Sequence, residues 1–324
     1  MSPARPQIAV VVPSHDRTIR LRWLLNALEE QTLAHERFEV IVCHDCSDMR
    51  TVELLDHHPL AAEGVLRHVA LAPGKRPPGL QRNAALELVQ APLVLFTDDD
   101  CRPPPNWLER ALAASERNPG AIVQGRTAPD PDELSIAYHV PHTRSQRIDP
   151  PVIWAQTCNI LYPRALLIRL GGFDEHMEAG EDTDLCLRAR ADGNPYVGAP
   201  EMLTYHAVHA LGLLGSLRTL PRWRHVAGLA KRHPTVRKHF SARIFWRESH
   251  GLLLLAIAGA GCARAHPVLA LLVLPWAVHS APSYGNSVRG RVRAVSELPA
   301  VALLDLAELG VMAAGSIRYR TLLL

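Results

Sequence analysis

Short apolar runs alternate with helix-like segments from residue 8 to about residue 210, and this alternation restricts the folds open to the chain. The strand-like runs are residues 8–12, 38–43, 66–71 and 93–97. The segments between them carry apolar residues at helical spacing, as in residues 21–28. Short apolar strands that alternate with amphipathic helices indicate a parallel sheet covered by helices on both faces. We therefore predict an α/β fold with a Rossmann-like, mostly parallel central sheet.

The composition suits a folded protein with a packed core. Hydrophobic residues make up 48% of the 324 residues and charged residues 21%, which argues against wholesale disorder. The formal net charge of +3 is too small to indicate a nucleic-acid binder. We predict an α/β domain over residues 1–215, a basic amphipathic linker with helices over 216–250, and a hydrophobic helical region over 251–324.

The C-terminal part of the chain has the composition of a membrane-seeking segment. Between Glu201 and Glu248 there is no acidic residue, and residues 251–278 carry a single charged side chain, Arg264. Prolines split this second stretch into halves shorter than the roughly 20 residues that a spanning helix needs. We interpret the tail as membrane-associated, as a helical hairpin, a re-entrant pair or one tilted span. The alternative is a buried helical subdomain or an oligomer interface.

The cysteines and the N-terminus point to a cytoplasmic location. The six cysteines are scattered, and Cys43 and Cys46 form one CxxC pair without a second pair at zinc-finger spacing. We expect reduced thiols. We also expect no cleavable signal peptide, because the N-terminal residues run straight into an apolar strand-like segment. Together with the basic stretch, this predicts the cytoplasmic face of the cell membrane, where an anionic leaflet attracts Lys and Arg, or otherwise the cytoplasm.

Three consecutive aspartates, Asp98, Asp99 and Asp100, end the apolar run 93–97. Adjacent like charges repel, and a divalent cation such as Mg²⁺ or Mn²⁺ relieves this repulsion by accepting carboxylate oxygens. The alternative is a solvated acidic turn or a helix cap. An apolar strand that points the triplet at one edge of the sheet, where parallel sheets bind ligands, favours the cation.

Several further motifs follow in a fixed order. They are residues 13–17 (PSHDR), 45–48 (DCSD), 79–83 (GLQRN), 96–103 (FTDDDCRP), 171–175 (GGFDE) and 180–188 (GEDTDLCLR). Each motif is weak alone, but in this order, over roughly residues 6 to 210, the chain resembles the family 2 glycosyltransferases. The resemblance implies the GT-A fold, an inverting reaction and a nucleotide-sugar donor.

The resemblance implies a set of donor-binding residues. They are Pro13, His15, Arg17, Asp45, Arg82, Asp98 and Asp99. His15 falls where a ring often stacks on the nucleobase, and Asp45 falls where an acid accepts a hydrogen bond from it. The family's common Asp-Asp-Gly-Ser is here His44-Asp45-Cys46-Ser47, which leaves the base preference open. Arg82 either faces the donor phosphates or only begins a helix.

The resemblance also implies residues for the cation and for catalysis. Asp100 would bind the metal, with His206 as a further ligand, although His209 competes for that role. Asp182 matches the catalytic base that accepts the proton of the acceptor hydroxyl. The residues expected on the acceptor side or in support of this base are Trp154, Asp174, Glu181 and Asp184. A structural alternative is that the acids at 181–184 cap the start of a helix.

The leading hypothesis is an inverting, metal-dependent glycosyltransferase. It would move a sugar from a nucleotide-diphosphate donor to a hydroxyl of a lipid-linked or saccharide acceptor, in cell-envelope, polysaccharide or glycolipid synthesis. One alternative is a nucleotidyltransferase-like enzyme, which the absence of glycine in residues 13–17 disfavours. The other is a catalytically inactive, membrane-bound sugar-binding scaffold.

Overall fold

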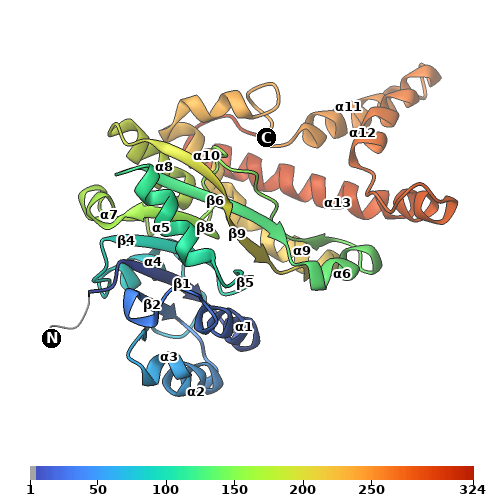
Figure 1. Cartoon of the computed structure of the whole chain (residues 1–324). Helices are drawn as coiled ribbons and strands as arrows, with labels where there is room; N and C mark the ends of the chain where they lie inside the picture. The colour runs from blue at the N-terminus through green and yellow to red at the C-terminus, as the bar shows by residue number, and fades with distance from the viewer. Residues whose placement is uncertain (1–4) are drawn as a thin grey trace. The chain divides into compact units, whose positions relative to one another are not determined.

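The computed structural model describes residues 5–324, which form two compact units (Figure 1). The first unit contains the residues through Leu134 together with Ser145–His209. The second unit contains Ser135–Arg144 and Ala210–Leu324. The segment that ends the first unit is thus followed directly by the basic and apolar part of the sequence.

An eight-stranded sheet organises the first unit, in the strand order β3-β2-β1-β4-β8-β6-β9-β5. The strands are β1 (Ile8–Ser14), β2 (Phe38–His44), β3 (Leu66–Ala70), β4 (Leu93–Thr97), β5 (Cys101–Arg102), β6 (Ile122–Pro129), β8 (Asn159–Pro163) and β9 (Tyr196–His206). The pairs β3-β2, β2-β1, β1-β4 and β6-β9 are parallel, whereas β8 runs antiparallel to β4 and β6, and β5 runs antiparallel to β9. The predicted α/β class with a mostly parallel sheet is confirmed.

Helices cover both faces of this sheet, which explains why its strands are apolar throughout. The helices of the first unit are α1 (Thr18–Glu29), α2 (Met49–His57), α3 (Pro59–Ala62), α4 (Pro78–Leu86), α5 (Trp107–Arg117), α7 (Arg164–Leu170) and α8 (Glu181–Ala191). In β1, Val10 and Val12 pack into the core cluster of α1, α2, α3 and α5. Ala9 and Val11 pack into the opposite cluster, with residues of α4, α7 and α8. Because both faces are buried, neither can be polar.

The sheet order determines which loops meet. Strands β2, β1 and β4 are parallel neighbours, so their carboxyl ends, followed by Asp45, by residues 14–17 and by the aspartate triplet, lie at one edge of the sheet. The last strand of this sheet in sequence order, β9, pairs with β5 so that His206 lies opposite Cys101. The aspartate triplet therefore lies next to His206, a residue more than a hundred positions later in the sequence.

The second unit is helical. Its main helices are α9 (Gly212–Thr219), α10 (His225–Arg232), α11 (Glu248–Cys262), α12 (Val273–Ser280) and α13 (Val288–Tyr319). The helix α6 (Leu134–His139) and the short strand β7 (Thr143–Arg144) supply its other segment, and β10 (His209–Ala210) begins at the boundary. Within residues 5–324, α13 is the one helix long and apolar enough to cross a membrane. The predicted hydrophobic helical C-terminal region is confirmed.

Candidate active site

The ends of β1 and β4 are joined through the aspartate triplet. Asp99 accepts hydrogen bonds from Ser14 Oγ at 2.9 Å and from Arg17 Nη1 at 3.1 Å. The same Arg17 nitrogen donates to Asp100 Oδ2 at 2.5 Å. Arg17 was expected beside the nucleotide, and in this structure it offsets the charge of two buried carboxylates. Ser14 received no role from the sequence, although its place at the end of a buried strand was the available signal.

The two buried carboxylates of the triplet have opposite pKa shifts. Burial, followed by repulsion from Asp100, raises the pKa of Asp99 to about 7. Burial alone would also raise the pKa of Asp100, but the hydrogen bond from His209 and the charges of His206 and Arg17 outweigh it and hold that pKa well below its usual range. Asp100 is thus the carboxylate of this pair that stays ionised at neutral pH.

Asp100, His206 and His209 form a cluster suited to a divalent cation. One ligand atom from each residue lies within 4.8 Å of the others. His209 Nε2 contacts Asp100 Oδ2 at 2.8 Å, and His206 Nε2 lies 3.5 Å from Asp100 Oδ1, a buried oxygen that has no hydrogen-bond partner among the described residues. His206 Nδ1 lies 2.9 Å from the carbonyl oxygen of Ala207. A proton on Nδ1 satisfies that carbonyl and leaves Nε2 free as a ligand. Both histidines named by the sequence therefore reach Asp100.

Arg82 connects the triplet to the acids at the start of α8. This buried guanidinium donates to Asp98 Oδ1 at 2.8 Å and to Glu181 Oε1 at 3.0 Å. These two carboxylates, which come from different parts of the chain, offset the charge of an arginine that is otherwise fully buried. Arg82 was expected at the donor phosphates or at a helix start. It lies in the first turns of α4 and holds the two acidic groups of the site together.

Asp182 lies in the first turn of α8, beside Glu181. Its Oδ1 accepts a hydrogen bond from the Thr183 backbone N–H at 2.7 Å. Burial, and next the charge of Glu181, raise the pKa of Asp182 to about 8, against the opposing effects of Thr183 and Arg82. A carboxylate with such a pKa is a stronger proton acceptor once it is ionised. Asp184 points elsewhere and binds Arg188 Nε at 2.8 Å.

A second group of contacts surrounds Asp45 at the end of β2. Asp45 is fully buried, and its two oxygens accept from His15 Nδ1 at 2.7 Å and from the Arg76 backbone N–H at 2.6 Å. The two residues expected at the nucleobase are thus in direct contact. Pro13 belongs to β1, one residue before Ser14.

The residues expected on the acceptor side have mainly structural contacts. The Trp154 carbonyl accepts from Thr183 Oγ1 at 2.7 Å, and Asp174 Oδ1 accepts from the His176 backbone N–H at 3.0 Å. Asn83 holds the turn at 171–175 through Phe173, whose backbone N–H and carbonyl both bond to the Asn83 amide at 2.9 Å. Sequence reasoning missed this role of Asn83, which depends on a turn 90 residues away.

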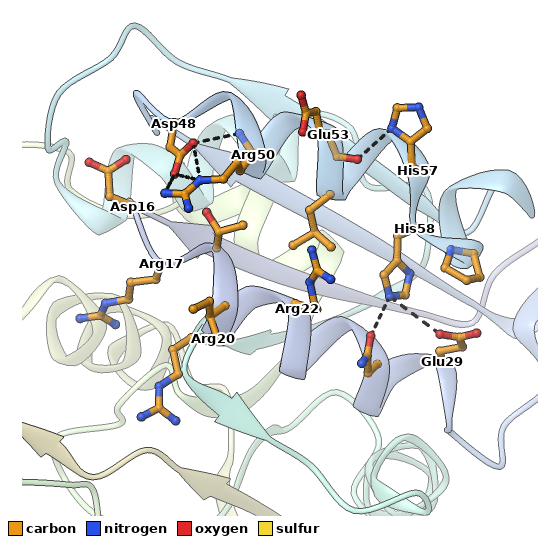
Figure 2. A pocket seen from close by; sticks show the side chains of 15 residues that line it. Asp16, Arg17, Arg20, Arg22, Glu29, Asp48, Arg50, Glu53, His57 and His58 are labelled. Carbon is orange, nitrogen blue, oxygen red and sulfur yellow. Dashed lines mark hydrogen bonds and ion pairs between the residues drawn. The ribbon is translucent and has the colours of Figure 1, made fainter.

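A pocket of about 1130 Å³ is lined by α1, α2 and the segments next to them, and one of its lining residues, Arg17, also contacts Asp99 and Asp100 (Figure 2). Asp16 and Arg17 line one end of it. Asp48 and Arg50 pair with each other there, and His58 contacts Asn26 and lies 3.8 Å from Glu29. Most of its charged groups thus already have partners, so the pocket offers space beside the site without a second set of free chemical groups.

The family model described as glycosyl transferase family 2 matches residues 9–176, just over half of the chain. Validoxylamine A glucosyltransferase of Streptomyces hygroscopicus is 27% identical over 245 residues, covering 63% of this chain and 56% of that protein. The chain thus spans about half the length of such curated relatives.

Two solved structures share the fold. The mannosyltransferase PcManGT from Pyrobaculum calidifontis, in complex with GDP-Man and Mn²⁺, superposes with a TM-score of 0.56 at 17% identity, covering 98% of this chain and 87% of that one. TarS of Staphylococcus aureus, in complex with UDP-GlcNAc, superposes with a TM-score of 0.54 at 18% identity, covering 97% and 91%. The central sheet therefore has the GT-A arrangement.

Proposed function

This chain belongs to glycosyl transferase family 2, and we propose that it transfers a sugar, with inversion, from a nucleoside-diphosphate donor to an acceptor hydroxyl. The observation that carries the proposal is the position of Arg82, which contacts both Asp98 and Glu181. Through it, the triplet and the neighbour of Asp182 belong to one site. A single displacement needs both a stabilised leaving group and a proton acceptor.

The donor side is proposed for the ends of β1, β2 and β4. Asp45 and His15 would recognise the nucleobase, because a buried carboxylate accepts from base N–H groups and an imidazole can stack on a ring. Pro13, Arg17, Asp98 and Asp99 would face the rest of the donor. The complexes of PcManGT with GDP-Man and of TarS with UDP-GlcNAc support a nucleotide sugar as the donor class.

The cation would be held by Asp100 and His206, with His209 in reach. The free Asp100 Oδ1 and the available Nε2 of His206 fit a Mg²⁺ or Mn²⁺ ion. When bound, such an ion offsets the negative charge that develops on the leaving diphosphate. Asp100 supplies a ligand that is ionised at neutral pH, because His209, His206 and Arg17 hold its pKa low.

Asp182 is proposed to accept the proton of the attacking hydroxyl. Thr183 fixes the orientation of its carboxylate through the backbone N–H, and burial together with the charge of Glu181 raises its pKa. The single displacement forms the bond from the acceptor oxygen to the anomeric carbon while the bond to the diphosphate breaks. The proton moves to Asp182, and the diphosphate leaves with the bonding electron pair. Trp154, Asp174, Glu181 and Asp184 would support the acceptor side.

The acceptor is proposed to be a lipid-linked or saccharide hydroxyl at the cytoplasmic face of the cell membrane. Along α13, exposed apolar residues recur every three or four positions or at multiples of that spacing: Val288, Val292, Val295, Leu303 and Leu306. This spacing forms one apolar stripe on a helix. Lys and Arg of the preceding basic segment add attraction to anionic lipids.

A donor panel tests the proposed function. Purified protein with Mn²⁺ is incubated with UDP-, GDP- and dTDP-linked sugars, and release of the nucleoside diphosphate is measured. We expect turnover with one donor class, its loss in Asp182→Asn, and retained donor binding in that variant, since the amide oxygen can still accept from Thr183. Asp192→Asn, at the far end of α8, is the matched control. A folded protein that turns over none of the donors supports the scaffold alternative.

A further inference from the structure

A second cluster of ligand-type side chains lies in the helical unit, apart from the site described above. It consists of His250 on α11 and of Asp305 and Glu308 on α13. None of the three exposes more than 7% of its surface, and one ligand atom from each lies within 4.8 Å of the others. Asp305 and Glu308 are three residues apart, which puts both on the same face of α13.

Each carboxylate of this cluster has one oxygen fixed by a donor from elsewhere. Trp276 Nε1 donates to Asp305 Oδ2 at 3.0 Å. Arg247 Nε lies 3.0 Å from Glu308 Oε2. The other oxygen of Glu308, Oε1, is buried without a hydrogen-bond partner among the described residues. This division is typical of metal-binding carboxylates, in which one oxygen binds the ion and the other is oriented by a hydrogen bond.

His250 gives the independent sign of a missing ligand. Its side chain is completely buried, and neither ring nitrogen has a hydrogen-bond partner within the described part of the chain. Its Nε2 lies 3.5 Å from Glu308 Oε2, an oxygen that Arg247 already occupies. Leaving a buried polar group without a hydrogen-bond partner destabilises the folded state. A protonated His250 would face Glu308 Oε2 through Nε2, but its Nδ1–H and Glu308 Oε1 would both stay buried without partners, so a simple ion pair leaves part of the geometry unexplained.

We propose that His250, Asp305 and Glu308 bind a divalent transition-metal ion, zinc foremost, that joins α11 to α13. One imidazole nitrogen with carboxylate oxygens suits zinc, whereas Mg²⁺ and Ca²⁺ prefer oxygen ligands throughout. The two carboxylates offset the charge of the ion, and Arg247 and Trp276 orient them. Three protein ligands leave a coordination position for water. The role is structural, because the ion would connect two helices, α11 and α13, that have 25 residues of sequence between them.

The test uses the full chain with the first cluster disabled. In the background Asp100→Asn/His206→Ala/His209→Ala, zinc per chain is measured after equilibrium dialysis, and cobalt(II) absorption serves as a spectroscopic probe. We expect one bound ion per chain in this background and none when His250→Ala is added. His279→Ala, which removes an exposed histidine of the same unit, should keep the ion. Trp276→Phe should weaken zinc binding by about 10–100-fold.

Thermal unfolding distinguishes a bound ion from a misfolded variant. Zinc should raise the unfolding temperature of the background protein, with or without the added His279→Ala substitution. It should not change the unfolding temperature when His250→Ala is added instead. Glu308→Gln, with circular dichroism to establish folding, serves as a second ligand variant. The proposal is overturned by equal zinc content with and without His250, by absence of a zinc effect on unfolding in the background, or by an equal effect of Mg²⁺ or Ca²⁺.

Discussion

Arg82 donates to Glu181 Oε1 at 3.0 Å, and both side chains are buried. The bond joins the first turns of α4 to the first turn of α8, across 99 residues of sequence. Because Arg82 also contacts Asp98, its removal should affect the triplet and the proposed base together.

Replacing Arg82 with methionine should therefore impair both stability and activity. Breaking a buried ion pair by removing one partner costs about 3–5 kcal/mol. We expect a lower urea midpoint and, in conditions where the protein remains folded, a large loss of transfer rate. Arg169→Met is the control, because Arg169 pairs with Asp192 at the surface, and it should change neither measurement appreciably. Equal effects of the two variants would refute the linking role of Arg82.

The pH dependence of transfer should follow Asp182. Its pKa is raised to about 8, and it must be ionised to accept a proton. The rate should therefore rise with pH and level off above about 8, when saturating donor and cation are present. Asp182→Asn should remove this limb along with the activity. A rate that is flat between pH 6 and pH 9 contradicts the assignment, provided that chemistry limits turnover.

The same shift predicts how stability depends on pH. The folded state holds the Asp182 proton more tightly than the unfolded state, so protonation of Asp182 stabilises the folded protein. This stabilisation is fully present below a pH of about 4 and is lost as the pH rises through about 8. The unfolding free energy of the wild type should fall across this window relative to that of Asp182→Asn. Urea titrations in EDTA at several pH values measure the difference. If the unfolding free energy of the wild type instead rises with pH relative to that of Asp182→Asn, the pKa of Asp182 is not raised.

Cation dependence should follow Asp100 and the two histidines. We expect EDTA to abolish transfer and Mn²⁺ or Mg²⁺ to restore it. Asp100→Asn and His206→Ala should each raise the Mn²⁺ concentration for half-maximal activity by at least tenfold, about 1.4 kcal/mol. His209→Ala, measured beside them, shows whether His209 binds the ion or only orients Asp100. His176→Ala, an exposed histidine, should behave as wild type.

Substitutions of two neighbouring glycines between α7 and α8 should distinguish the effect of backbone strain on stability from the effect of side-chain crowding. Gly171 and Gly172 have φ values of +71° and +70°. A Cβ on Gly171 would meet nothing within 4 Å, whereas one on Gly172 would clash with Asn83 Oδ1. Gly171→Ala should lower the free energy of unfolding by about 1–2 kcal/mol, the cost of a left-handed conformation for alanine. Gly172→Ala should lower it by more, because it adds the clash with Asn83. In an Asn83→Ala background the difference between the two should shrink. Chemical denaturation provides the comparison.

The local part of the fold was predictable from the sequence, and the pairing of distant side chains was not. The run 93–97 is β4 to the residue, and the runs starting at Ile8 and Phe38 begin β1 and β2. Such strands are recognised by apolar length alone. The contact of Arg17 with Asp100 depends on the order of the strands in the sheet. The contact of His206 with Asp100 depends on the register of β9 with β5. No periodicity in the sequence encodes either, so only motif resemblance indicated these residues, and their catalytic roles stay predictions.

The helical unit illustrates the same limit. The sequence indicated an apolar, basic tail, and Asp305 and Glu308 are two acidic residues within an apolar stretch of that tail. Their proximity to His250 depends on how α11 packs on α13, which hydropathy does not specify. Exceptions of this kind within an apolar segment are worth following into the structure, because burying a charge requires a partner.

The pairing of His206 with Cys101 has a consequence for the order in which the protein becomes competent during synthesis. The ends of β1, β2 and β4 are present once the first hundred residues have emerged from the ribosome. Both histidines of the cation cluster belong to residues 206–209, so a nascent chain that stops earlier carries the triplet and Asp45 but neither imidazole. Closing the sheet over such a sequence separation is slow compared with local pairing. Uptake of the proposed cation would therefore be a late step of maturation, and a product truncated before residue 206 would lack both imidazoles of the cluster.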